Sequence, residues 1–167
     1  IMDIYTIPVA GGEPTPLQLS RSAEARFPCW SPNGKTIAFV ATQRGATEQD
    51  VRMHIETVPA SGGEVRRISS DADDVMYSNL AWSPDGTRLV FMSNRRVQYT
   101  YDLLIINSDG TGLTKITDAR GWNGHPDWSP DGSKIVFDTS RTGSFEIFTI
   151  NIDGSDAANL TNNTEWD

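Results

Sequence analysis

Short apolar runs alternate with polar, glycine-containing turns along the whole chain. Three of these runs are Ile37–Val40, Leu89–Phe91 and Ile135–Phe137, and each closely follows a polar turn. β-Branched and aromatic residues dominate the runs, as is typical of strands in a packed sheet. No stretch shows a helical period of useful length. The pattern therefore predicts an all-β chain.

The same pentapeptide precedes each of these runs. Trp-Ser-Pro-Asp-Gly begins at Trp82 and again at Trp128, and Trp30 begins a copy with Asn33 in place of the aspartate. Proline sets φ for the first central position of a type I turn, and Asp or Asn suits the second. Glycine then takes the following left-handed position without a steric penalty. Each copy thus predicts a β-hairpin.

A second apolar strand follows each hairpin and runs into a glycine turn. Examples are Ile55–Val58 before Gly62, and Glu146–Ile150 before Gly154. A short closing strand follows each turn, as at Asn159–Thr161. The repeating unit is an aromatic strand, two apolar strands and a short outer strand. Four-stranded units that recur at a nearly regular interval indicate β-propeller blades.

We expect residues 1–167 to form a single portion of a propeller. Residues 1–20 are predicted to be the last two strands of a blade. Full blades are predicted at residues 26–70, 78–118 and 125–163. This amounts to about three and a half blades of a ring that has six to eight. The end blades should expose apolar faces, so we expect a fragment of a longer polypeptide or self-association with a second copy. The fragment is favoured, because two paired copies would leave the first two strands without inner strands.

Composition limits the classes of partner. The formal net charge is −8 and the pI is about 4.7, with scattered Lys and Arg residues. This balance disfavours a nucleic-acid surface and adhesion to anionic lipid. No apolar run is long enough to cross a bilayer, so no membrane insertion is expected. The single cysteine, Cys29, allows no internal disulfide, and its place beside Trp30 predicts a buried, unreactive thiol.

No combination of residues predicts catalysis, a cofactor or a metal site. His54 and His125 are too few and too poorly partnered to bind a metal on their own. The sequence has no His-Glu-x-x-His, no Gly-x-Ser-x-Gly and no cysteine pair. The Asp-Gly turn at Asp109 lacks the alternating carboxylates and the closing glutamate of a calcium loop. We therefore expect a protein that binds rather than one that catalyses.

The tryptophans fall into two groups. Trp30, Trp82 and Trp128 share one position of the repeat, so we expect them to be buried between blades rather than to stack on a sugar or a base. Trp122 and Trp166 lie outside the motif, in the connections between blades. For these two, ligand binding and packing under a loop are both open.

Several charged residues lie near the predicted loops. Arg141 and Glu146 flank one short loop, and we expect an ion pair that braces it. Arg96 occupies a similar place and is left open as a ligand contact. The acidic cluster at residues 71–74 is expected to be a solvated loop, with cation binding as the alternative.

The most regular copy resembles a known family. It begins with Pro-x-Trp-Ser-Pro-Asp-Gly-x-x-Ile-x-Phe at Pro126–Phe137. The segment Arg141–Phe148 then leads into the second apolar strand, and Asp153–Thr161 contains an Asp-Gly turn followed by Leu-Thr. This pattern resembles the repeats of TolB-type propellers and covers nearly the whole chain. It is less similar to WD repeats, because no copy closes on a Trp-Asp dipeptide. Similar repeats occur in the propellers of prolyl-oligopeptidase-like and tricorn-like peptidases and of some sugar lyases, so the motif indicates a fold more than a function.

The resemblance to TolB implies a periplasmic propeller that binds protein partners at the mouth of its channel. We therefore predict a non-catalytic interaction module located in the periplasm or outside the cell. The alternative is part of the gating propeller of a peptidase, or part of a propeller lyase. An attached α/β-hydrolase domain with Gly-x-Ser-x-Gly would identify the peptidase, and a short N-terminal α/β domain would identify TolB.

The predicted contact residues lie in the connections between blades and in the loops between second and third strands, which should share one face. These segments vary between copies whereas the Ser-Pro-Asp-Gly turns are nearly identical, and a specific site needs such variation. The predicted partner-binding residues are Asp74, Arg96, Tyr99, Trp122, Asn123 and His125.

Overall fold

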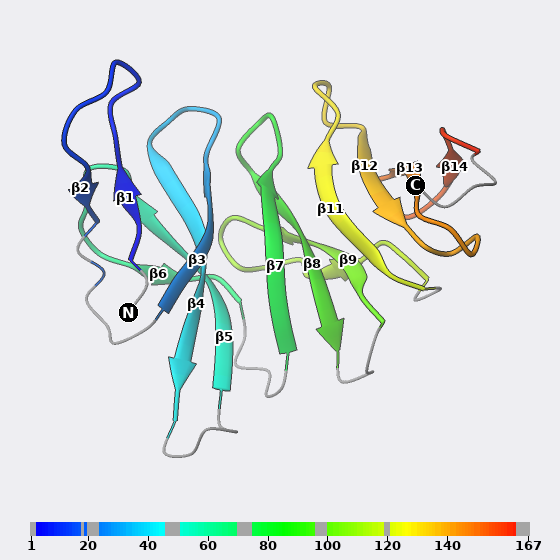
Figure 1. The fold of residues 1–167 in the computed structure, drawn as a ribbon, viewed down its shortest axis with the longest axis horizontal. Coiled ribbons are helices and arrows are strands. Elements are labelled where there is room, and N and C mark those ends of the chain that lie inside the picture. The colour runs from blue at the N-terminus through cyan, green and yellow to red at the C-terminus, as the bar shows by residue number, and fades with distance from the viewer. Residues whose placement is uncertain are drawn as a thin grey trace.

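The computed structural model shows an all-β chain whose strands form one two-stranded and three four-stranded antiparallel sheets (Figure 1). It describes residues 3–17, 19, 24–45, 51–69, 75–95, 100–118 and 121–162, without the side chains of residues 75 and 95. The two-stranded sheet pairs β1 (Tyr5–Thr6) with β2 (Thr15–Pro16). The predicted propeller-blade architecture is confirmed.

Each four-stranded sheet is one blade, with its strands in chain order from the inner strand outward. Blade B contains β3 (Glu24–Trp30), β4 (Thr36–Arg44), β5 (Val51–Pro59) and β6 (Arg66–Arg67). Blade C contains β7 (Val75–Trp82), β8 (Arg88–Arg95), β9 (Asp102–Asn107) and β10 (Thr114–Lys115). Blade D contains β11 (Asn123–Trp128), β12 (Lys134–Thr139), β13 (Glu146–Asn151) and β14 (Ala158–Asn159). The inner strand β7 contacts both β3 and β11, so the blades stand side by side (Figure 1).

The Ser-Pro-Asp-Gly turns join the inner strand of each blade to the second strand. In blade C the amide of Gly86 donates to the carbonyl of Ser83 at 2.8 Å, which closes the turn. The Asp85 carboxylate accepts from the Ser83 hydroxyl at 2.6 Å and from the Thr87 amide at 2.9 Å. The aspartate therefore fixes the turn from inside, which explains its place in the motif.

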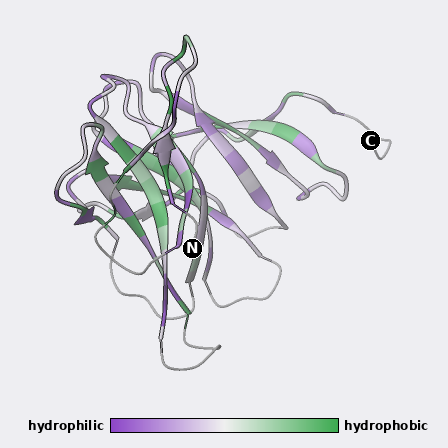
Figure 2. Cartoon of the chain, turned by 60° about the vertical axis from the view of Figure 1, so that its left-hand side comes forward, coloured by the Kyte–Doolittle hydropathy of each residue, from purple (hydrophilic) through white to green (hydrophobic). Residues whose placement is uncertain are grey.

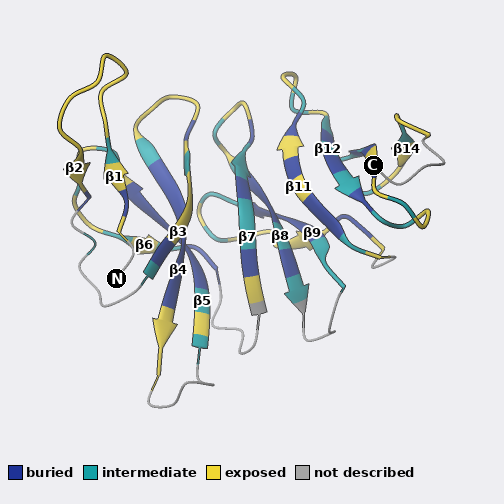
Figure 3. Cartoon of the chain, in the orientation of Figure 1, coloured by how far each residue is buried: buried dark blue, intermediate teal, exposed yellow. Residues whose placement is uncertain are grey.

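The hydrophobic core lies between the blades. On β8, Leu89 and Phe91 pack toward blade B, whereas Val90 packs toward blade D. Because alternate side chains of a strand point to opposite faces, a strand that is covered on both faces must be apolar throughout. Burial is accordingly continuous along the middle of β4, β5 and β9, whereas it alternates along β12 and β13 of blade D (Figure 3). Hydrophobic residues concentrate in the strands of the blades (Figure 2).

The three repeat tryptophans are not equally buried. Trp128 is 7% exposed, Trp82 is half-buried, and Trp30 is 54% exposed. The prediction that all three are buried is therefore wrong for Trp30. The indole N–H of each of the other two donates to a carbonyl of the preceding blade's inner strand, Cys29 for Trp82 and Ala81 for Trp128. Among the described residues, the sheet that precedes blade B consists of β1 and β2 alone, so no inner strand of that sheet accepts from the indole of Trp30.

Each inner strand contains a bulge at one position of the repeat. The residue three places before the motif tryptophan has a positive φ in all three blades, namely Phe27 at 53°, Asn79 at 52° and His125 at 44°. The pairing register of each inner strand shifts at this point. Bulges of this kind redirect side chains and are common near functional sites.

Cys29 lies on β3 and is partly buried. Burial raises the pKa of its thiol to about 12, so the reactive thiolate is suppressed. This agrees with the expected unreactive role.

Candidate functional site

The predicted contact residues divide into two groups. Trp122, Asn123 and His125 lie at the start of β11. Asp74, Arg96 and Tyr99 lie outside the described residues. The site is therefore built from blade D and the part of blade C that faces it.

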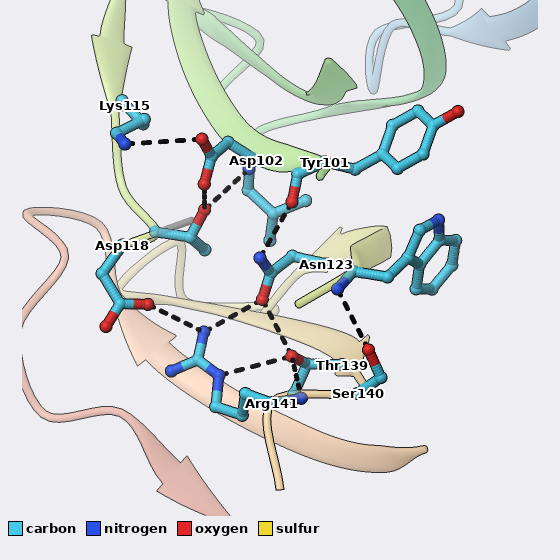
Figure 4. Close-up of polar contacts among 11 residues, drawn as sticks. Tyr101, Asp102, Lys115, Asp118, Asn123, Thr139, Ser140 and Arg141 are labelled. Atoms are coloured by element: carbon cyan, nitrogen blue, oxygen red, sulfur yellow. Dashed lines mark hydrogen bonds and ion pairs between the residues drawn. The ribbon is translucent and has the colours of Figure 1, made fainter. Parts of the chain in front are cut away.

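Asn123 is fully buried at the base of this region and uses its amide internally (Figure 4). Its Nδ2 donates to the carbonyl of Tyr101 at 2.8 Å, which ties blade D to blade C. Its Oδ1 accepts from the Thr139 hydroxyl at 2.9 Å and from Nη2 of Arg141 at 3.0 Å. Asn123 thus holds the site from below, and because its side chain is buried it supports the neighbouring residues instead of offering a surface of its own.

Arg141 braces the loop, but not through the predicted partner. Its Nη2 lies 3.8 Å from the Asp118 carboxylate, in the connection between blades C and D (Figure 4). Its guanidinium carbon also lies 5.4 Å from the ring centre of Phe137 and 5.1 Å from that of Phe148. Glu146 instead accepts from the hydroxyl of Thr161. Arg141 therefore connects neighbouring segments of the fold, and its guanidinium is not a free ligand-binding group.

Above this layer lies an aromatic cluster, which we define as Tyr101, Trp122, His125 and Phe145. The Trp122 ring centre lies 5.3 Å from that of His125, 5.3 Å from that of Phe145 and 6.4 Å from that of Tyr101. The contacts to Tyr101 and Phe145 are edge-to-face, a favourable geometry for aromatic pairs. The structure thus brings Trp122 and His125 together.

A glycine makes room for the cluster. A Cβ atom at Gly124 would lie 2.1 Å from Cη2 of Trp122, far inside contact distance. The indole therefore lies directly over the backbone of β11. The amide of Trp122 is also fixed, because it donates to the hydroxyl of Ser140 at 3.0 Å. Backbone and ring of Trp122 are therefore both held in place by the fold.

His125 links the cluster to a groove along the inner strands. Its Nδ1 lies 3.1 Å from a carboxylate oxygen of Asp138, and its side chain is 66% exposed. It also lines an open groove of about 660 Å³ along the inner strands, together with Trp30, Asn79 and Trp82. His125 lies at the bulge of β11, where its φ is 44° and the pairing register shifts.

Tyr101 and Phe145 were missed at the sequence level. Phe145 lies directly before β13 and looks like part of its apolar run in the sequence. Its side chain is nevertheless 58% exposed. The available signal was its position, because a large aromatic at the end of the loop between second and third strands lies on the face where partner contacts were expected.

The described residues contain no group of three or more His, Cys, Asp or Glu side chains placed to hold a metal ion. Within that same part of the chain, no helix has the length and apolar character to span a membrane.

Comparisons with known proteins agree with this architecture. The sequence model of one family, described as the TolB beta propeller domain, matches residues 72–167. The crystal structure of TolB from Acinetobacter baumannii superposes with a TM-score of 0.76 over 97% of this chain and 38% of that one. Its sequence identity is 21%, so this likeness shows the fold alone.

Two curated proteins are similar in sequence. An uncharacterized protein of Agrobacterium fabrum is 31% identical over 113 residues, which cover 68% of this chain and 37% of that protein. The uncharacterized peptidase YuxL of Bacillus subtilis is 34% identical over 89 residues, which cover 52% of this chain and 12% of that protein. The chain thus spans well under half the length of either relative.

Proposed function

This chain belongs to the TolB beta propeller domain family, and we propose that it is a non-catalytic binding module that contacts a protein partner through the aromatic cluster. The observation that carries the proposal is the exposed ring of Phe145 against Trp122. These rings are supported from below by the buried network of Asn123 and Arg141. A rigid aromatic anchor on a pre-formed base is the usual form of an energetic hot spot in a protein interface.

The chemistry of the surface favours protein over other classes of partner. The net charge of −8 disfavours nucleic acid and anionic lipid. Tyr, Trp and Phe are enriched in protein interfaces, where they supply large contact areas at a low entropic cost. We expect no cofactor and no turnover of peptide or ester substrates by the chain itself.

The family resemblance also supports a place for the module in the periplasm or outside the cell. The same resemblance supports a contact at the mouth of the propeller channel. His125 supports that position, since it belongs both to the aromatic cluster and to the groove along the inner strands.

Site-specific photo-crosslinking tests the proposal. A photoreactive phenylalanine analogue replaces Phe145 in one sample and Pro130, in a Ser-Pro-Asp-Gly turn, in the matched control. Both samples are incubated with an extract of the source organism. We expect one protein to crosslink at position 145 and not at position 130. That protein is then purified and titrated against the parent chain and against Phe145→Ala.

The titration decides the outcome. We expect Phe145→Ala to weaken binding by about 2 kcal/mol, the size of a hot-spot aromatic. Equal affinity for the parent chain and the variant would refute the site. Crosslinking at position 130 alone would move the contact to the turns.

A second function is supported by the sequence similarity to the peptidase YuxL. In this case the chain would be part of a propeller that accompanies a peptidase domain. The complete gene product distinguishes the two. An α/β-hydrolase domain with Gly-x-Ser-x-Gly would favour the peptidase, and a crosslinked partner encoded by a separate gene would favour the interaction module.

A further inference from the structure

His125 offers a hydrogen-bond acceptor to groups outside the chain. Its Nδ1 lies 3.1 Å from one carboxylate oxygen of Asp138 and 3.3 Å from the other. A carboxylate only accepts hydrogen bonds, so Nδ1 of the neutral imidazole carries the proton and Nε2 keeps its lone pair. Because the side chain of His125 is 66% exposed, this lone pair is available to a donor on a partner.

Aromatic rings lie beside this acceptor. The ring centre of Trp122 lies 5.3 Å from that of His125, and Tyr101 and Phe145 flank the same indole. The face of an aromatic ring is partly negative and attracts a cation within about 6 Å of the ring centre. An extended cationic side chain that binds at Nε2 can therefore also contact the indole.

The charges near His125 favour a cation as well. The Asp138 carboxylate lies behind the imidazole, and the exposed Asp127 lines the same groove as His125. The positive charge of Arg141, in the layer below, is 14% exposed and already faces Asp118 at 3.8 Å. The whole chain has a net charge of −8. Complementarity of charge thus favours a partner that presents a positive group here.

We propose that the partner presents an arginine side chain to the aromatic cluster. This inference rests on the proposed function, because it names the chemistry of the partner at the same site. The guanidinium donates to Nε2 of His125 and packs on the ring of Trp122, while the carboxylate of Asp138 favours its charge. Arginine fits better than lysine, because the guanidinium is planar, stacks on aromatic faces and is less strongly hydrated than an ammonium group.

An NMR titration of the intact chain with small probes tests this inference. The probe is N-acetyl-arginine methylamide, and the comparison is the citrulline analogue, which has nearly the same shape but no charge. The indole N–H resonances are followed at constant ionic strength, and that of Trp122 is assigned with Trp122→Phe. We expect a saturable shift with a Kd in the range of about 1–10 mM for the arginine probe. Citrulline should bind about fivefold more weakly or worse, because it lacks the charge.

Substitutions in the chain assign the contacts. His125→Phe keeps a ring beside Trp122 but removes the acceptor, so it should weaken arginine binding about fivefold. Asp138→Asn should also weaken it, because the charge behind the imidazole is lost. Asp131→Asn is the matched control, since it removes the same charge from a Ser-Pro-Asp-Gly turn, and it should leave arginine binding unchanged. A dispersed amide spectrum should show that each variant is folded.

Three results would overturn the inference. The first is the absence of a saturable Trp122 shift when the arginine probe reaches about 100 mM, well above the expected Kd. The second is equal binding of the citrulline probe. The third is equal binding of N-acetyl-lysine methylamide, because the site would then accept any cation.

The proposed function is decided separately, by crosslinking and titration at position 145. A protein captured there, without any preference of the chain for arginine, would keep the interaction module and reject only its arginine contact. The reverse result, selective arginine binding with no protein captured, would reject the proposed function and leave the arginine site in place.

Discussion

At the scale of single residues, the turn aspartates connect the repeat motif to acid stability. The pKa values of Asp85 and Asp131 are lowered to about 2, first by the hydroxyls of Ser83 and Ser129, and then by the backbone amides two residues on. The stability that comes from a depressed carboxyl pKa is fully present above the ordinary value near 3.8 and is lost as the pH falls toward 2.

The copy with Asn33 provides a natural comparison. Its Oδ1 accepts from the hydroxyl of Ser31 at 2.9 Å and from the amide of Lys35 at 2.9 Å, the same two bonds without a titrating group. We therefore expect the double variant that carries Asp85→Asn and Asp131→Asn to lose less stability than the parent chain as the pH falls from about 4 to about 2. Urea unfolding midpoints across this range measure the effect. Parallel pH profiles for parent and variant would contradict it, and Asn33→Asp should add acid sensitivity.

The tryptophans yield a second prediction at this scale. Trp128→Ala should lower the free energy of unfolding by about 3–5 kcal/mol, because the buried ring loses its packing and its N–H bond to Ala81. The ring also carries the guanidinium of Arg88, whose carbon lies 5.0 Å from its centre. Trp30→Ala is the matched control and should change stability by less than about 1 kcal/mol. Equal losses in chemical denaturation would show that exposure does not distinguish the two sites.

The same residues show where sequence reasoning ended. The motif correctly identified a common position for the tryptophans, but burial depends on what the neighbouring blade offers. Trp30 differs from Trp128 only in its surroundings. Asn123 was selected because it lies in a connection between blades, yet its amide faces Thr139 and Arg141 within the fold. Neither outcome is visible in the local sequence, because both are set by contacts between segments far apart in the chain.

At the scale of elements, the hairpins and blades were predictable because turn chemistry and strand alternation are local. The bulges in the inner strands were not. Phe27, Asn79 and His125 all have positive φ at one repeat position but share no residue type. Asparagine and histidine adopt this conformation more often than other residues do, whereas phenylalanine does so rarely, so Phe27 in particular is held there by the pairing on either side of the bulge. A conformation imposed by the sheet leaves no compositional signal.

The turns between third and fourth strands show how one element constrains the next. A Cβ atom at Gly110 would lie 2.7 Å from the carbonyl oxygen of Ile68, and one at Gly154 would lie 2.9 Å from that of Ile116. These glycines let the turn of one blade approach the backbone of the preceding blade. The equivalent Gly62 has a similar φ of 81° but no neighbour within 4 Å.

This difference allows a controlled substitution. Gly62→Ala and Gly110→Ala should both be strained by a positive φ, at a cost of about 1–2 kcal/mol. Only Gly110→Ala must also push Ile68 away, so it should lower stability by about 1–3 kcal/mol more. Thermal or urea denaturation of the two variants measures the gap. If the two losses are equal, the close approach between blades contributes nothing beyond the backbone strain.

At the scale of the whole molecule, the blades form a linear array in which each core is shared by two neighbours. One cluster joins blades B and C, a second joins C and D, and a third joins the β1–β2 segment to blade B. Stability in such an array is close to a sum of terms for each unit and each interface. The aromatic cluster lies on blade D, which takes part in only one of these clusters.

Blade D should consequently open more readily than blade C. Phe91 on β8 packs toward blade B and Val90 packs toward blade D, so both faces of that strand are covered. On blade D, Phe137 packs toward blade C, whereas Ile147 on the other face is 39% exposed. The strands β8 and β12 are otherwise matched, since each is hydrogen-bonded to a strand on both sides.

Hydrogen exchange tests this arrangement directly. We expect amides in β8 to exchange more slowly than those in β12, because the free energy of local opening rises with the number of covered faces. Peptides from both strands can be followed by mass spectrometry in a single sample. Binding of a partner at Phe145 should slow exchange in β12 and β13 while leaving β8 nearly unchanged. Equal protection of β8 and β12 in the free chain would contradict this prediction. It would mean that the array unfolds as one unit and that its blades do not open independently.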